Sequence, residues 1–142
     1  MAASRAAMTS GVLTRAPCGA TSPLMVEITQ EFGFDAAHFL ENAPQGSNRR
    51  MHGHSFYAEV TLRGEPDKHQ GWVRDFGEVN AVLGDIRETL DHCLLNEVEG
   101  LGQPTLENLA RYIYGRAKMQ LPEVCRVRLR RPSHGQSCVY EG

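Results

Sequence analysis

The chain of 142 residues has the length of one domain, and its 41% apolar and 23% charged residues are ordinary for a globular protein. The formal charge is −2 at pH 7 with no accompanying basic face or motif, so nucleic acid is not an expected partner. No apolar run approaches the ~18 to 20 residues of a membrane span. Four cysteines are widely spaced without a CxxC pair, which favours free thiols in a reducing compartment, and we expect a cytoplasmic protein.

The N-terminal segment differs in composition from the rest of the chain. Residues 1–24 are rich in Ala, Ser, Thr, Gly and Arg and contain no acidic residue. They have no apolar core long enough for a secretory signal peptide. We interpret them as a disordered extension or as the result of a start codon assigned too early, with an organellar transit segment as a further alternative. The folded domain is expected to cover residues 25–142.

Two alternating patterns predict the first two strands. In the first, the even positions from Val26 to His38 carry mostly apolar side chains. The second pattern starts at His52, runs to Gly64, and again places apolar side chains at even positions. Residues 41–50 between them are polar and rich in turn formers, so they should form a loop. If the strands pair as an antiparallel hairpin, the end of the first lies beside the start of the second.

Three histidines fall where these strands should meet. His52 and His54 share one face of their strand and lie about 6.6 Å apart along it. His38 ends the preceding strand and would lie beside both. A single His-x-His pair is weak evidence for a metal site, because isolated histidines are usually surface residues. Three histidines that meet are stronger evidence, because catalytic zinc usually has three protein ligands and an open fourth position. The sequence therefore predicts a zinc site formed by His38, His52 and His54.

Two helices are predicted after the second strand. Asp75 and Thr105 each resemble an N-cap. After each cap, apolar residues recur every three or four positions, as in an amphipathic helix. These are Phe76, Val79, Leu83, Ile86 and Leu90 in the first helix, and Leu106, Leu109, Ala110, Ile113 and Ala117 in the second. The first helix should end at Asp91 and His92.

Two short strands are predicted at the end of the chain. Cys125, Val127 and Leu129 alternate with arginines, and a turn at residues 132–135 leads into a run at 138–140. The order strand, strand, helix, helix, strand, strand predicts an α+β fold with a four-stranded antiparallel sheet and both helices on one face. Such a small sheet has two exposed edges, which favours assembly with other copies.

Five ordered motifs resemble the family of 6-pyruvoyl tetrahydropterin synthase and 6-carboxytetrahydropterin synthase. They are FDAAH at 34–38, HGHS at 52–55, GWVRDF at 71–76, LDH at 90–92 and PTLENLA at 104–110. The resemblance runs from about Val26 to Gly142 and is nearest the 6-carboxytetrahydropterin synthase branch, which feeds queuosine and other deazapurine synthesis. It implies a tunnelling fold, in which sheets from three subunits close a barrel and two trimers stack into a homohexamer with active sites between subunits.

The resemblance also implies an activity. The chain would be a zinc-dependent lyase that converts 7,8-dihydroneopterin triphosphate to a 6-substituted tetrahydropterin. His38, His52 and His54 would hold the zinc, while Asp91 would orient His92 in a charge-relay pair. Alternatives within the family are a 6-pyruvoyl tetrahydropterin synthase and an aldolase-like cleavage of the pterin side chain. An alternative of another class is a non-catalytic protein that binds zinc and pterin.

The sequence departs from the family at two positions. The catalytic cysteine, usually four residues before the His-x-His pair, is replaced by Asn48, which is not a good general base at neutral pH. The glutamate that anchors the pterin falls on Arg131 or Pro132. A carboxylate suits the donor edge of a pterin ring, and neither replacement does. Arg131 is therefore a substrate-binding candidate whose chemistry differs from that of the family.

Two further candidates lie near the motifs. Cys93 follows His92 and could supply a thiolate if its pKa were lowered, although a small packed residue is the simpler interpretation. Thr105 could contact the pterin, although its N-cap role already accounts for it. We therefore expect His92, oriented by Asp91, to be the principal acid-base group.

Overall fold

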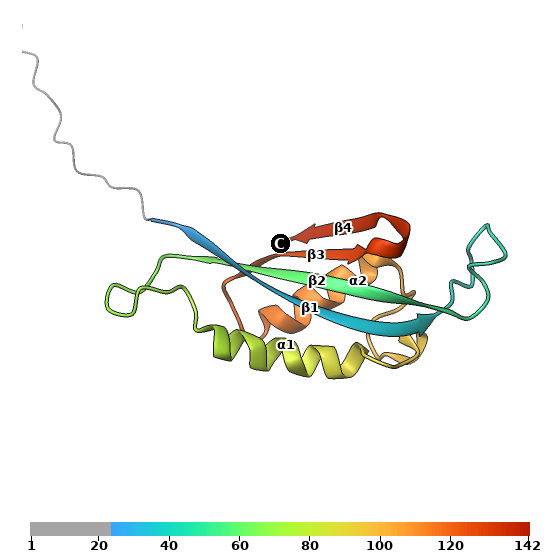
Figure 1. The fold of residues 1–142 in the computed structure, drawn as a ribbon, viewed down its shortest axis with the longest axis horizontal. Coiled ribbons are helices and arrows are strands. Elements are labelled where there is room, and N and C mark those ends of the chain that lie inside the picture. Colours follow the sequence, from blue (N-terminus) through green and yellow to red (C-terminus); the bar gives the residue numbers. More distant parts are fainter. Residues whose placement is uncertain (1–23) are drawn as a thin grey trace, which may run out of the picture.

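The computed structural model describes residues 24–142. The predicted N-terminal extension falls on residues outside this range, apart from Leu24. Within the range, one sheet and two helices form the α+β unit expected from the order of the patterns (Figure 1). Neither helix of the described residues has the length and apolar content that crossing a bilayer requires.

The sheet has the strand order β1-β2-β3-β4, and every neighbouring pair is antiparallel. The strands are β1 (Val26–His38), β2 (His52–Gly64), β3 (Val124–Arg131) and β4 (Gln136–Glu141). All four predicted strands are confirmed, and the last two begin slightly before their predicted residues. β1 and β2 pair over their full length, from Val26 opposite Gly64 to His38 opposite His52. This register brings the histidines of the two strands to the same end of the sheet.

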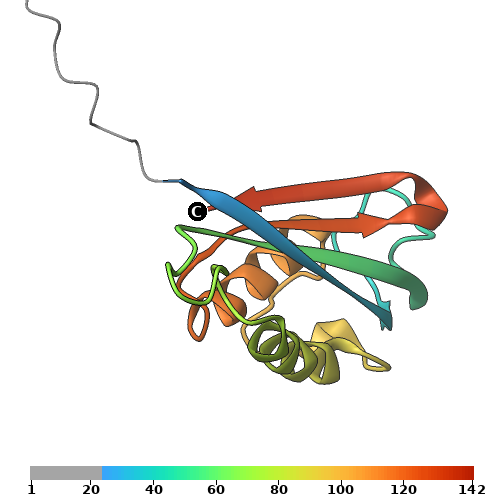
Figure 2. The ribbon, with the colours of Figure 1, turned by 60° about the vertical axis from the view of Figure 1, so that its left-hand side comes forward.

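Both helices lie on the same face of the sheet, as two views of the molecule agree (Figures 1 and 2). They are α1 (Phe76–Leu90) and α2 (Leu106–Lys118). The Asp75 side chain accepts hydrogen bonds from the backbone N–H groups of Gly77 and Glu78. The Thr105 hydroxyl accepts one from Asn108. Both predicted N-caps are therefore confirmed.

The hydrophobic core lies between the sheet and the helices. The even-numbered residues of β2 from Phe56 to Leu62 are buried, together with the inner stripes of both helices. Phe76 was predicted to belong to the inner apolar stripe of α1, and this prediction was wrong, because the residue is 47% exposed. It stands at the first position of α1, one turn before Val79, where burial in that helix begins. Leu106, at the same position of α2, is only partly buried.

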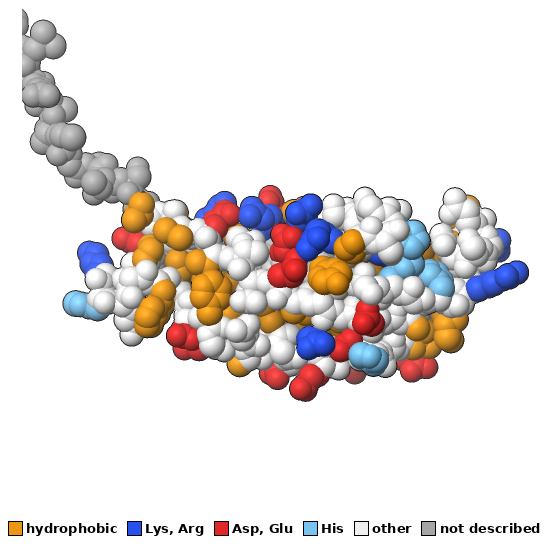
Figure 3. Space-filling model, in the orientation of Figure 1, with side chains coloured by type: hydrophobic (Ala, Val, Ile, Leu, Met, Phe, Trp, Pro, Cys, Tyr) orange, Lys and Arg blue, Asp and Glu red, His pale blue; other side chains and the backbone are white. Residues whose placement is uncertain are grey.

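The other face of the sheet is charged. Its ion pairs join Glu27 with Arg63 and Arg126, Glu31 with Arg130, and Glu59 with Arg128 and Arg130. Figure 3 shows acidic and basic side chains intermixed over the strands. The sheet therefore has one polar and one apolar face. If a strand shifted by one residue along its neighbour, all its core side chains would move to the charged face, so the register of strand pairing is strongly specified.

Candidate metal centre and active site

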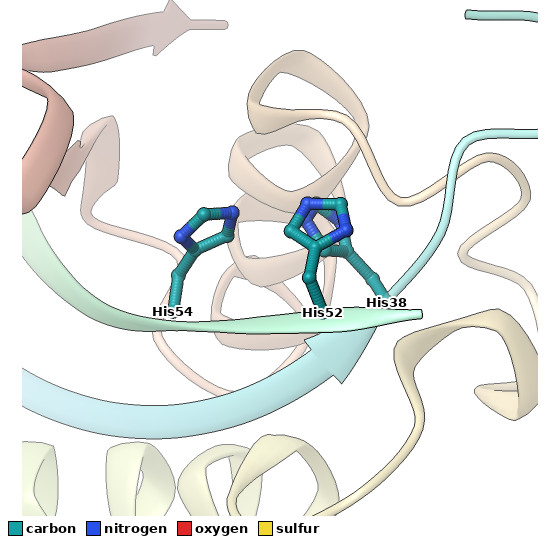
Figure 4. Close-up of side chains that lie close together, drawn as sticks. All are labelled: His38, His52 and His54. Carbon is teal, nitrogen blue, oxygen red and sulfur yellow. The ribbon is translucent and has the colours of Figure 1, made fainter. Parts of the chain in front are cut away.

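Three histidine side chains meet where β1 ends and β2 begins (Figure 4). Their ring centroids are 4.6 Å apart for His38 and His52, 5.2 Å for His38 and His54, and 4.9 Å for His52 and His54. One ring nitrogen from each lies within 4.8 Å of the other two. His38 is 2% exposed, and the other two are half-buried. The predicted cluster is therefore present, and zinc as its occupant stays a prediction.

Backbone carbonyl groups orient two of the rings. Nδ1 of His38 lies 2.8 Å from the carbonyl oxygen of Pro104, and Nδ1 of His52 lies 2.7 Å from that of Arg50. Because a carbonyl only accepts, both Nδ1 atoms carry the proton and leave Nε2 as a metal-binding lone pair. Nε2 of His38 and Nε2 of His54 are buried without a hydrogen-bond partner. A buried polar atom without a partner is costly, and a metal ion would satisfy both, so this donor set fits zinc.

The surroundings of the cluster favour neutral imidazoles. Burial lowers the pKa of His38 below its ordinary value. Burial, followed by the positive charge of Arg131 and the neighbouring histidines, lowers the pKa of His54 from 6.5 to about 4. Metal binding requires the neutral form of histidine. At neutral pH these two ligands are therefore ready to bind an ion without first releasing a proton.

The segment after α1 runs along the edge of β1 that faces away from β2. The backbone N–H of His92 donates to the carbonyl of Asp35 at 2.7 Å, and that of Ala37 donates to the carbonyl of Cys93 at 3.0 Å. His92 adopts a φ of 55°, which is uncommon for a residue other than glycine. These bonds fix the backbone of His92 to β1, the strand that carries His38 at its end.

The Asp91 carboxylate is held in its ionised form next to His92. Its Oδ1 accepts the N–H of Asp35 at 2.9 Å and lies 3.1 Å from Nδ1 of His92, while Arg87 donates to Oδ2 at 3.2 Å. The N–H of Asp35, helped by His92 and Arg87, holds the pKa of Asp91 below its ordinary value. A carboxylate at Nδ1 orients the ring and leaves Nε2 for proton transfer. The His92 side chain is 81% exposed, so a ligand can reach that atom.

An open pocket of about 670 Å³ is lined by His54, His92 and Cys93. The pocket thus brings together His54, a predicted metal ligand, and the two predicted proton-transfer residues, His92 and Cys93. Burial, with the charges of Asp91 and Glu97, raises the pKa of the Cys93 thiol. A thiol with a raised pKa is a poor source of thiolate at neutral pH. His92 is therefore the better acid-base group of the two.

A second pocket, of about 350 Å³, adjoins His38 and is lined by Thr105 and Arg131. The Thr105 hydroxyl accepts the N–H of Asn108 at 3.3 Å, so it serves the helix while lining the pocket. Arg131 donates from Nε to Oε1 of Gln136 at 3.1 Å. The two substrate-binding candidates, Thr105 and Arg131, thus lie beside the histidine cluster, in a different pocket from His92.

Asn48 stands where the family resemblance places a cysteine. Its carbonyl accepts the N–H of Leu40 at 2.8 Å, and its side-chain amide donates to Gln45 at 3.3 Å. These contacts stabilise the loop between β1 and β2. An amide does not titrate near neutral pH, so Asn48 cannot replace a thiolate as a base.

His134 is a site residue that no sequence pattern indicated. Its ring centroid lies 4.8 Å from that of His54. It belongs to the 3-10 helix Pro132–His134 between β3 and β4. The pairing of β2 with β3, with Tyr57 opposite Arg130, brings this turn to the cluster. Such pairing between distant segments leaves no local pattern in the sequence.

The sequence is similar to those of known pterin enzymes. Residues 27–142 match the family described as 6-pyruvoyl tetrahydropterin synthase. The chain is 38% identical over 94 residues to a 6-carboxy-5,6,7,8-tetrahydropterin synthase of Synechocystis sp., covering 63% of this chain and 72% of the relative. It is 34% identical over 99 residues to the dihydroneopterin monophosphate aldolase of Pyrococcus furiosus, covering 70% and 81%.

A solved structure shares the fold. The 6-pyruvoyl tetrahydropterin synthase of Caenorhabditis elegans superposes with a TM-score of 0.74 at 24% identity, over 84% of this chain and 97% of that one. The four-stranded sheet with two helices is therefore the fold of that enzyme. Together with the match over residues 27–142, this shows that the chain belongs to the 6-pyruvoyl tetrahydropterin synthase family.

Proposed function

We propose that this protein is a zinc-dependent lyase acting on the side chain of a dihydropterin. The first candidate reaction is synthesis of 6-carboxy-5,6,7,8-tetrahydropterin from 7,8-dihydroneopterin triphosphate. The observation that carries the proposal is the histidine cluster, in which the buried Nε2 atoms of His38 and His54 lack partners. Membership of a pterin-metabolising family supports the substrate class, and 38% identity to the Synechocystis synthase supports the first candidate.

The residues of the site have separate roles in this proposal. His38, His52 and His54 would hold zinc, which when bound supplies Lewis acidity towards the hydroxyl groups of the substrate side chain. Asp91 keeps Nδ1 of His92 protonated, so that Nε2 of His92 exchanges a proton with the substrate. Their shared pocket of about 670 Å³ is within the usual range for a small-molecule site.

Aldolase-like cleavage of the pterin side chain is the second candidate. The observation that favours it is the 34% identity to the Pyrococcus furiosus aldolase over 81% of that protein. Both reactions require proton movement at hydroxyl groups of the side chain. The same zinc ligands and the same His92 would therefore serve either reaction. Assembly into a hexamer, a cytoplasmic location and a part in queuosine synthesis stay predictions.

Product analysis tests the proposal. Zinc-loaded protein is incubated with 7,8-dihydroneopterin triphosphate and, separately, with the monophosphate, and the pterin products are identified by mass spectrometry. A 6-carboxy product supports the first candidate, and a hydroxymethyl pterin supports the second. A 6-pyruvoyl product would replace both with an elimination that keeps all side-chain carbons. No turnover of either substrate by protein with about one zinc per chain would overturn the lyase proposal in favour of a binding protein.

A further inference from the structure

Arg131 is the one half-buried arginine of residues 24–142 without a carboxylate partner. The other half-buried arginines, Arg74, Arg126 and Arg130, each lie within 3.0 Å of a glutamate oxygen. Arg131 instead donates from Nε and Nη2 to the amide oxygen of Gln136, its cross-strand neighbour. A neutral amide leaves the guanidinium charge uncompensated, and partial burial makes that costly.

The guanidinium lies at the histidine cluster. Arg131 lines the pocket of about 350 Å³ that adjoins His38. After burial, its charge is the next largest cause of the lowered pKa of His54, and it also contributes to the lowered pKa of His38. Of the five N–H donors of an arginine, two are directed to Gln136, which leaves three for a ligand.

The remaining wall of this pocket is largely apolar. Leu40, Phe56 and Leu106 contribute to it. The one carboxylate among the described residues that line it is Glu107, whose side chain is exposed and forms no ion pair with Arg131. The pocket therefore combines an apolar wall, suited to a flat ring, with a cation that no group of its own lining neutralises.

We propose that this pocket binds an oxyanion, a carboxylate or a phosphate, carried on a small planar ring and held by Arg131. The planar guanidinium matches two oxygens of such a group and forms charge-assisted hydrogen bonds to them. The bound anion neutralises the half-buried charge while the ring packs on Leu40 and Leu106. This inference concerns binding alone, so it holds or fails independently of turnover by the proposed lyase.

Isothermal titration calorimetry at constant ionic strength tests the pocket with benzoate and phenyl phosphate as probes. Zinc-loaded and metal-free protein are both titrated, and benzamide serves as the neutral analogue of benzoate. At least one anion should bind, benzamide should bind more weakly than benzoate, and Arg131→Gln should weaken anion binding about tenfold or more in both forms. Arg130→Gln is the matched control, because Arg130 pairs with Glu31 and Glu59 on the other face, and it should keep the parent affinity.

The outcomes separate the two anion classes. Binding of benzoate alone identifies a carboxylate pocket, and binding of phenyl phosphate alone identifies a phosphate pocket. No binding of either anion, equal affinity for benzamide and benzoate, or equal affinity of the parent and Arg131→Gln would overturn the proposal. Circular dichroism and zinc content check the folding of Arg131→Gln. If it does not fold, Arg131→Lys, which keeps the charge but loses the planar fork, should still bind the anion more weakly, and parent-like affinity would overturn the proposal.

Discussion

Acidification should destabilise the metal-free protein through His54. Its folded-state pKa is lowered to about 4, whereas the same side chain titrates near 6.5 when unperturbed. Between these values the unfolded chain binds a proton that the folded protein does not. The stability linked to His54 is therefore fully present above the unfolded pKa and is lost as the pH falls towards the folded pKa. The whole shift corresponds to at most about 3 kcal/mol of unfolding free energy, and solvent screening of the partly exposed ring reduces this value.

Urea unfolding between about pH 7 and pH 4, followed by far-UV circular dichroism, measures this effect. Protein concentration is held constant and a chelator keeps the protein metal-free. His54→Gln should show a flatter pH dependence, by up to about 1.4 kcal/mol per pH unit in this window. Ser55→Ala is the control, because it changes the next residue without removing a titratable group. Parallel pH profiles for the parent and His54→Gln would refute the reasoning.

Four other predictions address the metal, the base, a helix cap and assembly. His52→Ala should lose tight zinc binding by elemental analysis, and full zinc content in that folded variant would remove His52 from the ligand set. His92→Ala should lower kcat by roughly 100-fold or more at normal zinc content, whereas Cys93→Ser should cost little; the opposite ranking would give the base role to the thiol. Thr105→Ala should lower the free energy of unfolding by about 1 kcal/mol in urea, because it removes the N-cap of α2, and an unchanged value would show that the cap is dispensable. Light scattering should give a closed oligomer, with six subunits expected from the resemblance, and a monomer at micromolar concentration would contradict it.

Local patterns in the sequence account for most of the elements. Alternation along residues 26–38 and 52–64 predicts β1 and β2 because one face of each strand packs against the helices. Asp75 and Thr105 predict the helix starts because a cap bonds to groups two or three residues away. The meeting of His38 and His52 also follows, since consecutive strands that pair antiparallel bring adjoining ends together.

Features that depend on distant contacts could not be predicted. His134 reaches His54 because β3 pairs with β2, and nothing in the turn itself specifies that register. The apolar periodicity shows on which face of α1 Phe76 lies, but not where the sheet that covers this face ends. The exposure of Phe76 was therefore not predicted. The family resemblance places the pterin-anchoring glutamate at Arg131 or Pro132, but the lack of a carboxylate partner for Arg131 depends on how β3, β4 and α2 meet.

The outer edge of β1 has two parts that differ in whether another strand could pair with them. Along residues 35–37 it is already bonded to the segment that carries His92, whereas along residues 26–33 no strand lies beside it in the described part of the chain. A strand added by a second copy would therefore run along residues 26–33 and stop before His92. The His92 segment would thus limit the reach of a neighbouring sheet and place the end of the added strand near the pocket of His54 and His92. Lengthening or shortening residues 91–94 would then change how copies align as well as where the imidazole points.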